Sequence, residues 1–541
     1  MAGNIILKKI KNPAGADVIM DKMPASIFND VIGPVMRGPS SSHVAGAARI
    51  AAVVRQSVGG DPLRAVVDFD VNGSLAASHD GHGTDMGFVC GMLGKEITEP
   101  DVDRYARLAR EAGVEIEFRI LDYGAEHPNN YRIEVWGRGG ERHLWEGVSV
   151  GGGMIEMRNY DGFPVSICGD FCEALVKFPR GGAAAMKDSP LVAGSAPDFA
   201  QVVEGGNGSL LLLKYSKAPD IEALRAAAAV QGALDFVFVK PMLPTLSRAN
   251  CSVPFSSARD MLAFSEGGNM PMWELAAEYE AARGGTSKDE ALDKMRMLVS
   301  IMEGSLKEGL AGTEYADRIL GPQARLIEAA RERGALIPCD ILNNVIKSIT
   351  AIMETKSAMG VIVAAPTAGS CGCLPGTLLG AGLALGKPKE EITRAMLAAG
   401  LIGIFIAEGA TFAAEVGGCQ VECGAGSGMA AAGLVQLMGG SAEQCVDAAS
   451  MALQNITGLA CDPVANRVEV PCLGKNVMGG SNAVASANMA LAGYDKVIPL
   501  DETIAAMYDV GLKLPLELRC TFGGLGKSPA ALKLLEKLKD R

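Results

Sequence analysis

Three cysteines in the last third of the 541-residue chain, Cys419, Cys461 and Cys472, are of the residue type that binds iron–sulfur clusters. A [4Fe–4S] cluster needs four protein ligands to be closed, so three thiolates would leave one iron open. An open iron is a Lewis acid that can polarise a hydroxyl group and help it to leave. The three cysteines therefore predict a [4Fe–4S] cofactor used for dehydration rather than for electron transfer.

The spacing of these cysteines does not identify a metal site by itself. The chain has 13 cysteines but none of the tight CxxC pairs typical of ferredoxins or zinc sites. A free cysteine is most often a small buried hydrophobic residue. The local sequence favours a site, because Cys419 follows two glycines and Cys472 follows a proline. Glycine-rich backbone can approach a cluster closely.

A Ser-Ser-Ser-His segment at 40–43 is a second candidate site. A Gly-Pro pair before it predicts a tight turn, and an apolar-periodic run from Val44 predicts a helix after it. Unpaired N–H groups at the beginning of a helix bind anions such as an amino acid's carboxylate. Simple N-capping would explain one serine, but not Ser40, Ser41 and Ser42 beside a histidine. We expect these serines to bind substrate.

Two of the five histidines, His43 and His82, are candidate catalytic residues. An imidazole titrates near physiological pH and can carry a proton. His82 lies between two glycines in Gly-His-Gly-Thr-Asp, a loop that can approach a ligand, although a histidine hydrogen-bonded within a turn fits the same pattern. The remaining histidines, His79, His127 and His143, lie in polar stretches, so we expect them at the surface or, for His127 before a proline, in a turn.

Small hydroxyl residues recur in Pro-Thr-Ala-Gly-Ser-Cys-Gly at 366–372. Thr367, Gly369 and Ser370 can supply backbone and side-chain donors to a carboxylate or an ammonium group. A turn between two helices would explain the glycines and the proline, but not the two hydroxyl residues. The segment is therefore predicted to position substrate.

The elements that must hold these residues form two main parts. The first part mixes one helical apolar pattern with several strand patterns, which predicts an α+β domain over residues 1–195. The helical pattern covers 44–57, and the strand patterns cover 65–71, 115–120 and 131–135.

The second part, residues 265–541, has helical apolar spacing, as at 291–310 and 338–359, and predicts a mainly α-helical catalytic domain that carries the cluster. Between the two parts, residues 196–264 have a βαβ-like pattern that predicts either a regulatory module or an extension of the first sheet. That pattern consists of strand-like 209–215, helix-like 221–230 and strand-like 234–239. Flexible Pro-rich or Ser-rich linkers are absent from the sequence, so we expect packed domains.

Composition excludes several classes of protein. The net charge is −12 without a Lys/Arg-rich run, which argues against nucleic-acid binding. Prolines and glycines interrupt the uncharged run at 358–386, and the next apolar run, between Arg394 and Glu408, has 13 residues, so we expect a buried core helix rather than a membrane span. The N-terminus lacks the apolar core of a signal peptide, and the odd cysteine count argues against a disulfide framework. These features predict a cytoplasmic protein with reduced thiols.

Six segments of the chain resemble the iron–sulfur-dependent L-serine dehydratases (L-serine ammonia-lyases), with beta and alpha regions fused in one chain. The resemblance runs from about residue 26 to the C-terminus. The segments are Ile-Gly-Pro-Val-Met-Arg-Gly-Pro-Ser-Ser-Ser-His at 32–43, Gly-His-Gly-Thr-Asp at 81–85, Ala-Ala-Pro-Thr-Ala-Gly-Ser-Cys-Gly at 364–372, Glu-Val-Gly-Gly-Cys-Gln at 415–420, Met-Ala-Ala-Ala-Gly-Leu at 429–434, and Cys-Asp-Pro-Val-Ala with the following Val-Pro-Cys at 461–472.

The resemblance implies that Cys419, Cys461 and Cys472 are the cluster ligands. Three other cysteines rank below them because the family pattern does not require those residues for the cluster; they are Cys371, Cys373 and Cys423. Of these, Cys423 is interpreted as a core thiol. Cys520, near the C-terminus, is a hypothetical further ligand of the cluster in its resting state.

The resemblance implies an oxygen-sensitive lyase of amino-acid catabolism and gluconeogenesis that converts L-serine to pyruvate and ammonia. The same chemistry on L-threonine or L-cysteine remains an alternative, because pocket shape decides between such substrates. A pyridoxal phosphate enzyme is disfavoured, because the best glycine-rich stretch, 417–428, contains no lysine. A non-catalytic amino-acid sensor is a further alternative. The expected partners are a small amino acid and a second copy of the chain in a homodimer.

Overall fold

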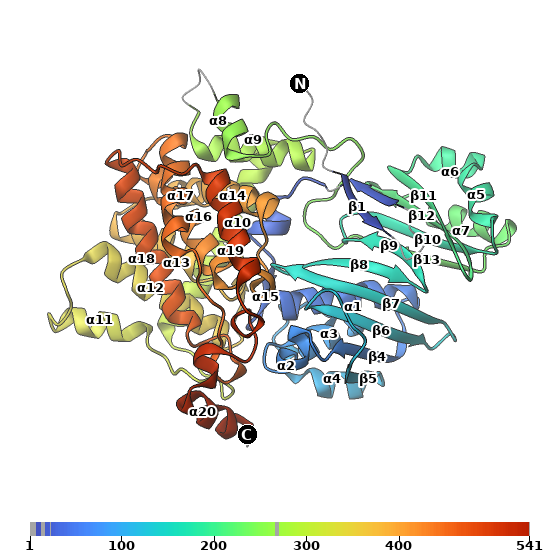
Figure 1. Ribbon diagram of the computed structural model, residues 1–541, viewed down its shortest axis with the longest axis horizontal. Coiled ribbons are helices and arrows are strands. Elements are labelled where there is room, and N and C mark those ends of the chain that lie inside the picture. The colour runs from blue at the N-terminus through green and yellow to red at the C-terminus, as the bar shows by residue number, and fades with distance from the viewer. Residues whose placement is uncertain (1–6, 12–16, 22, 266–269, 540–541) are drawn as a thin grey trace.

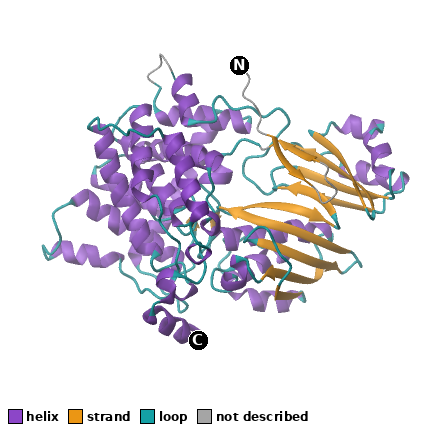
Figure 2. Ribbon diagram, in the orientation of Figure 1, coloured by secondary structure: helices purple, strands orange, loops and turns teal. Residues whose placement is uncertain are grey.

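The computed structural model describes residues 7–11, 17–21, 23–265 and 270–539. Most strands gather on one side of the molecule together with a few helices, and the other side is almost entirely helical (Figures 1 and 2). The predicted fold class, an α+β N-terminal region followed by a mainly helical C-terminal region, is confirmed. The chain begins with an antiparallel strand pair, β1 (Leu7–Lys11) and β2 (Asp17–Asp21).

A six-stranded sheet forms the core of the first region. Only β4 and β5 pair in parallel, and all other neighbours are antiparallel. In spatial order the strands are β5 (Glu115–Leu121), β4 (Pro62–Asp70), β6 (Asn130–Gly137), β7 (Arg142–Gly151), β8 (Met154–Tyr160) and β9 (Phe163–Ile167). The associated helices are α1 (Gly46–Ser57), α2 (Ser74–Ser78), α3 (Thr84–Leu93) and α4 (Tyr105–Ala112).

Alternation along β6 explains how this sheet binds its helices. Tyr131, Ile133 and Val135 are buried, whereas the residues between them are half-buried, as expected for a strand with one face on the core. These side chains share a hydrophobic core with Ile50 and Val54 of α1. The helix predicted at 44–57 and the three strands predicted in this region are therefore confirmed.

A second, four-stranded antiparallel sheet follows, with the strand order β11-β12-β10-β13. Its elements are β10 (Cys172–Phe178), α5 (Gly182–Lys187), α6 (Pro190–Ser195), β11 (Phe199–Gly205), β12 (Gly208–Tyr215), α7 (Ile221–Val230) and β13 (Asp235–Val239). This βαββαβ order is the ferredoxin-like arrangement. The boundary expected between residues 195 and 196 falls inside this unit, because β10 is an inner strand of its sheet.

Both faces of the second sheet are covered, which explains the run of four leucines in β12. Leu210 and Leu212 share a core with the six-stranded sheet, whereas Leu211 and Leu213 pack under the helices of the unit. A strand buried on both faces has a continuous apolar sequence instead of an alternating one. The segment is thus an independent sheet packed on the first one, rather than an extension of it.

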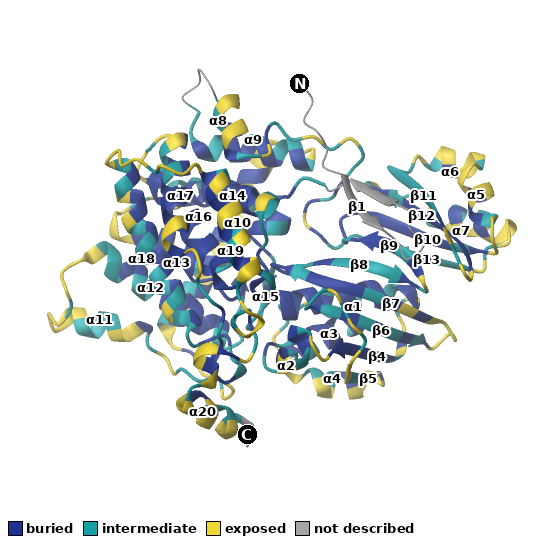
Figure 3. Ribbon diagram, in the orientation of Figure 1, coloured by how far each residue is buried: buried dark blue, intermediate teal, exposed yellow. Residues whose placement is uncertain are grey.

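The helical region packs around α16 (Cys423–Leu437), which is buried on all sides (Figure 3). The predicted helices at 291–310 and 338–359 correspond to α10 and α12. Besides α16, the α-helices of the region are α8 (Ala258–Phe264), α9 (Met272–Gly284), α10 (Lys288–Ala311), α11 (Ala324–Glu332), α12 (Asp340–Ser357), α13 (Cys373–Ala384), α14 (Lys389–Gly409), α15 (Ala414–Gly417), α17 (Ala442–Ile456), α18 (Cys472–Leu491), α19 (Leu500–Lys513) and α20 (Pro529–Lys539).

Glycine allows these helices to approach closely. A Cβ atom at Gly376 of α13 would lie 2.6 Å from Ile349 Cα of α12, closer than carbon atoms can pack. The apolar segment expected between Arg394 and Glu408 lies in α14. Among the described residues, α14 is the one helix long and apolar enough to cross a membrane, and 78% of its most apolar window is buried in the protein. Its burial agrees with the predicted core helix.

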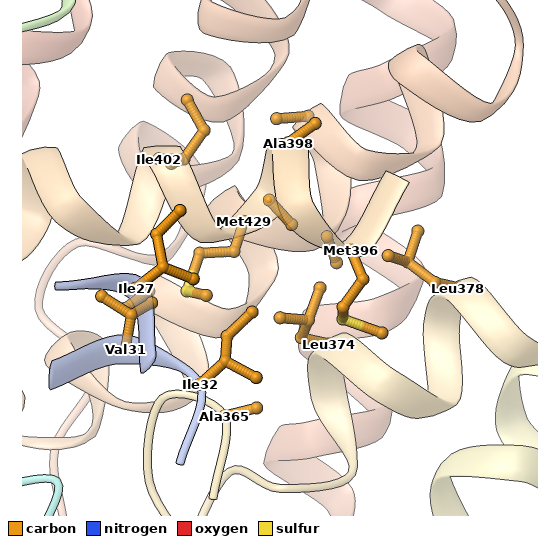
Figure 4. Packing of buried hydrophobic residues seen from close by; sticks show 14 of the residues in the cluster. Ile27, Val31, Ile32, Ala365, Leu374, Leu378, Met396, Ala398, Ile402 and Met429 are labelled. Carbon is orange, nitrogen blue, oxygen red and sulfur yellow. The ribbon is translucent and has the colours of Figure 1, made fainter. Parts of the chain in front are cut away.

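The segment that precedes the first sheet packs into the helical core. A π-helical turn, η1 (Ile27–Val31), carries apolar side chains against α14, and Ile27, Val31 and Ile32 point toward Met396, Ile402 and Met429 (Figure 4). Next along the chain, β3 (Val35–Met36) pairs with β14 (Ile362–Val363) from the helical region. The two regions are therefore joined by strand pairing as well as by side-chain packing.

Candidate active site and metal centre

Four cysteines form one buried thiol group, namely Cys419, Cys423, Cys461 and Cys520. Cys419 begins a single helical turn after α15, and Cys423 is the first residue of α16. Cys461 and Cys520 are held together by the backbone, since the Cys520 N–H donates to the Cys461 carbonyl oxygen at 2.9 Å. Figure 1 shows α15 at the boundary between the helices and the sheets, so the thiol group lies near this boundary.

The backbone around the thiol group requires unusual conformations. Gly418 has a φ of 75°, and a Cβ atom there would lie 2.9 Å from the Leu459 carbonyl oxygen. Only glycine fits such a close approach, as the sequence around Cys419 indicated. Cys520 has a φ of 59°, a conformation that costs a non-glycine residue free energy and often marks a functional site.

One of these thiols is strongly acidified. Hydrogen bonds from Cys423 and Cys461 hold the pKa of Cys419 well below its usual range, and the charge of Lys475 acts in the same direction. The Lys475 ammonium is itself fixed by Asp462 at 2.7 Å and by the Ala460 carbonyl oxygen at 2.6 Å. Donation to Cys419, together with burial, raises the pKa of Cys423 and Cys461. The group is therefore prepared to hold negative charge.

Cys472 lies beside this group rather than within it. It is the first residue of α18, its side chain belongs to the main helical core, and it interacts with Cys419 electrostatically. Glu422 is closer, because one of its carboxylate oxygens and the sulfurs of Cys419 and Cys461 all lie within 4.8 Å of one another. The structure thus brings together Cys419 and Cys461 of the predicted ligands, with Cys472 adjacent.

The lower-ranked cysteines take different positions. Cys371 Sγ lies 3.9 Å from Met353 Sδ, and Cys373 Sγ lies 3.8 Å from the Cys423 carbonyl oxygen. Burial raises the pKa of both thiols to about 12, so they behave as core residues. Cys423 differs from the core thiol that we expected, because it hydrogen-bonds to Cys419.

The residues present fit an iron–sulfur cluster. Thiolates are its usual ligands, and soft thiolate donors favour iron–sulfur clusters over hard cations. The acidified Cys419 and the neighbouring Cys461, Cys472 and Cys520 supply such a donor set. Because the other thiols of the set have raised pKa values, binding of a metal would have to displace their protons.

The serine segment holds His43 in one orientation. It forms a π-helical turn, η2 (Ser41–Ala45), before α1. His43 Nδ1 lies 2.9 Å from Ser40 Oγ, and His43 Nε2 lies 2.8 Å from Ser78 Oγ. Ser42 Oγ donates to Glu415 at 2.9 Å. The hydroxyls of this segment therefore bind protein groups, and both ring nitrogens of His43 are occupied.

The 366–372 segment meets the serine segment. The Ala368 N–H donates to Ser41 Oγ at 3.2 Å, across 327 positions of sequence. Thr367 Oγ1 donates to Glu422 at 2.7 Å and lies 3.1 Å from Ser370 Oγ. The predicted substrate-binding residues of this segment thus lie on a turn that contacts both η2 and Glu422, which is next to the thiol group.

Gly369 lies on the same turn. Its carbonyl oxygen accepts a hydrogen bond from Asn476 of α18 at 2.9 Å. The same amide group lies 3.5 Å from Cys423 Sγ. The substrate-binding segment and the thiol group are therefore linked by a single side chain.

His82 is fully buried, and neither of its ring nitrogens has a hydrogen-bond partner among the described residues. Its ring packs edge-on against His43, with 4.8 Å between centroids. Burial lowers the pKa of His82 well below its usual value, and the charges of Arg467 and Lys356 contribute to this shift. A neutral imidazole without a partner is costly unless it binds a ligand. His82 is therefore a neutral imidazole whose ring nitrogens are available for hydrogen bonds to a bound molecule.

The surface position expected for the other histidines is wrong for His143. This residue is 5% exposed, and its Nδ1 lies 3.0 Å from Asp161 Oδ2. Asp161 also forms an ion pair with Lys177 from the second sheet, so His143 belongs to a network of polar side chains rather than to the surface. His79 and His127 are half-buried.

A cavity of about 210 Å³ lies beside His82. Its wall includes Gly81 and Gly83, on either side of that histidine, and two cations, Lys356 and Arg467. Lys356, Arg467, Glu415 and Glu422 were not predicted as site residues from the sequence. The two glutamates could have been found, because they lie four residues before and three residues after the candidate ligand Cys419.

Two protein-family models match the chain, namely the serine dehydratase beta chain over residues 32–120 and the serine dehydratase alpha chain over residues 268–525. The first match covers the serine segment, His82 and two strands of the first sheet, β4 and nearly all of β5. The second covers the thiol group and the helices around it.

Individual relatives agree with these matches. The probable L-serine dehydratase alpha chain of Bacillus subtilis is 39% identical over 265 residues, which is 49% of this chain and 88% of that protein. The probable beta chain of the same organism is 42% identical over 151 residues, or 28% of this chain and 67% of the relative. L-serine dehydratase 2 of Escherichia coli is 25% identical over 500 residues, covering 90% of this chain and 95% of its own. The chain therefore belongs to the serine dehydratase family, with its beta and alpha regions fused in one polypeptide.

Proposed function

We propose that this protein is an L-serine dehydratase that converts L-serine to pyruvate and ammonia with a [4Fe–4S] cluster. The observation that carries the proposal is the position of His82. Its ring nitrogens have no partner among the described residues, its ring packs against His43, and the residues on either side of it, Gly81 and Gly83, line a cavity. The proposed site also includes the buried group of cysteines. Relatives of both regions are named as L-serine dehydratases or probable L-serine dehydratase chains.

The cluster ligands in this proposal are Cys419, Cys461 and Cys472, and Cys520 is the additional ligand in the resting state. The position of Cys520, hydrogen-bonded to Cys461, supports the second part. When bound, a cluster with one iron free of protein ligands supplies a Lewis acid for the substrate hydroxyl.

The protein's own residues supply binding and proton transfer. His82 is the general base that takes the α-proton of L-serine in this proposal, because both of its ring nitrogens are without a partner among the described residues. His43 packs against His82 and is fixed at both nitrogens, so it orients the base. The turn that contains Thr367 and Ser370 helps to position the substrate between His82 and the cysteines.

The overall reaction balances without a further reactant. The Cα–H bond and the Cβ–O bond of L-serine break, and water and aminoacrylate form. Aminoacrylate then tautomerises to an imine, and one water molecule hydrolyses the imine to pyruvate and ammonia. Because the cysteines that hold the cluster must remain reduced, we also propose that the protein works in the cytoplasm. We further propose a homodimer, because two-fold symmetry is the commonest arrangement of soluble oligomers.

Anaerobic purification with iron and sulfide analysis, followed by a pyruvate assay with L-serine, tests this proposal. About four irons per chain and pyruvate formation support it, and Cys419→Ala, Cys461→Ala and Cys472→Ala should each abolish activity. Cys445→Ala is a matched control, because Cys445 is a buried core thiol in α17. Turnover of L-threonine or L-cysteine alone would change the substrate. A stable protein that binds L-serine but no iron after reconstitution would favour a sensor.

A further inference from the structure

We propose that Lys356 binds the carboxylate of the substrate amino acid in the cavity beside His82. This inference deepens the proposed function and rests on it for the identity of the substrate. Lys356 belongs to α12 in the helical region, whereas His82 belongs to the N-terminal region. The substrate would thus be bound by both regions at once.

The pairing of Lys356 is incomplete. Its side chain is 1% exposed, and Nζ donates a hydrogen bond to the Val468 carbonyl oxygen. An ammonium group has three donors, and buried charges are normally paired with an opposite charge. Among the described residues, Lys356 forms no ion pair with a carboxylate. A buried cation in this state is stabilised by an anionic ligand.

Two of the four acidic residues of the cavity wall, Glu469 and Asp317, are engaged by groups other than Lys356. The Glu469 carboxylate accepts the backbone N–H groups of Ile319 and Leu320, each at 2.9 Å. Asp317 pairs with Arg467 at 2.8 Å. Neither of these two carboxylates therefore neutralises the charge of Lys356, which remains available to an anionic ligand.

The two cations of the cavity therefore differ in function. Arg467 is already neutralised by Asp317, whereas Lys356 has donors available. Lys356 also lies close enough to His82 and Cys472 for its charge to affect the pKa of both. A carboxylate bound to Lys356 would place the rest of a small amino acid between the candidate base and the cysteines. The predicted ligand is a small α-amino acid with a free carboxylate.

A comparison of L-serine with L-serinamide, which lacks the carboxylate charge, tests the assignment in the anaerobic holoenzyme. Loss of a charge-assisted hydrogen bond at a buried site reduces binding by on the order of 10- to 100-fold. Lys356→Met should lower kcat/KM for L-serine by about this factor and leave kcat/KM for L-serinamide within about threefold. Lys356→Arg keeps the charge and should retain more activity than Lys356→Met toward L-serine. Equal losses for both substrates would overturn the proposal.

Lys347→Met is the matched control, because Lys347 lies on the same helix and pairs with Glu328 at 2.9 Å, outside the cavity. It should leave the preference between the two substrates unchanged. If Lys356→Met does not fold, as judged by circular dichroism, Lys356→Gln serves as the second neutral variant. A preference for L-serine that persists in a folded neutral variant would overturn the assignment.

Binding of L-alanine, which has no hydroxyl group to lose, separates this proposal from the proposed function. Calorimetry on the holoenzyme should show that Lys356→Met weakens L-alanine binding by about 10- to 100-fold. Such a loss would support the carboxylate site even if no pyruvate formed from L-serine. Unchanged L-alanine affinity would overturn the site even if the enzyme were an active dehydratase.

Discussion

Replacement of His82 by glutamine should reduce catalysis without a comparable loss of stability. The His82 ring makes no hydrogen bond to the described residues, so the substitution breaks none. Its edge-on contact with His43 contributes about 0.5–1.5 kcal/mol. A general base contributes about 10²- to 10⁴-fold to the rate, which is about 2.7–5.4 kcal/mol of activation free energy. We therefore expect kcat to fall by about that factor, while the free energy of unfolding falls by about 1 kcal/mol.

His43→Gln should lower the free energy of unfolding more than His82→Gln does and lower kcat less. The His43 nitrogens bond to Ser40 and Ser78, and two lost neutral hydrogen bonds cost about 2 kcal/mol of stability. We expect kcat to fall by less than for His82→Gln, because His43 orients the base but does not take the proton.

The assays for this pair of variants are pyruvate formation, urea unfolding, and exchange of the α-hydrogen of L-alanine in D₂O, followed by mass spectrometry. Exchange reports the base directly, because L-alanine has no leaving hydroxyl. A His82→Gln enzyme that keeps kcat and the exchange rate within about tenfold of the unaltered enzyme would refute the assignment of His82 as the base.

Three further predictions concern His43, Cys520 and Gly376. Burial lowers the pKa of His43 to about 3, below the value of 6.5 in the unfolded chain, so its contribution to stability is present above pH 6.5 and is lost as pH falls toward 3. Urea unfolding should show a loss of about 1.4 kcal/mol per pH unit below pH 6 from this group, and an equal slope in His43→Gln would contradict the assignment. Cys520→Ala should alter the visible spectrum of the resting cluster, whereas Cys445→Ala should not; an unchanged spectrum and activity for Cys520→Ala would exclude it as a ligand. Gly376→Ala should cost about 1–3 kcal/mol in thermal unfolding, because its Cβ would lie 2.6 Å from Ile349 Cα, and an unchanged melting temperature would show that α12 and α13 can separate freely.

Much of the fold could be predicted because its elements have clear periodicity. The helical spacing at 338–359 corresponds to α12, and the strand pattern at 209–215 corresponds to β12. The domain boundary expected at residue 195 was placed wrongly, because it falls inside the four-stranded unit. The pairing of β10 with β12 and β13 is a long-range contact, and nothing in the local sequence of Cys172–Phe178 specifies which sheet it joins.

The sequence indicated which types of residue form the site, but not which of these residues contact one another. The Gly and Pro context of Cys419 indicated a close backbone approach, which Gly418 provides. The hypothesis that Cys520 approaches the cluster rested on its place near the C-terminus alone. Its pairing with Cys461 could not be predicted from the sequence, because that contact depends on a loop brought back from the C-terminal end of the chain. The burial of Lys356 was equally hidden, since a lysine near the end of an amphipathic helix is usually exposed.

The strand pairing between β3 and β14 has a consequence for assembly. Several relatives are named as alpha chains or as beta chains. Here the paired strands Val35–Met36 and Ile362–Val363 belong to one polypeptide. Tethering gives the two strands an effective concentration in the millimolar range, so their association does not weaken on dilution. A protease cut in the loop between β13 and α8 would leave two fragments still joined by this pairing and by the packing of Ile27 against α14. Covalent fusion here thus makes completion of the site independent of protein concentration.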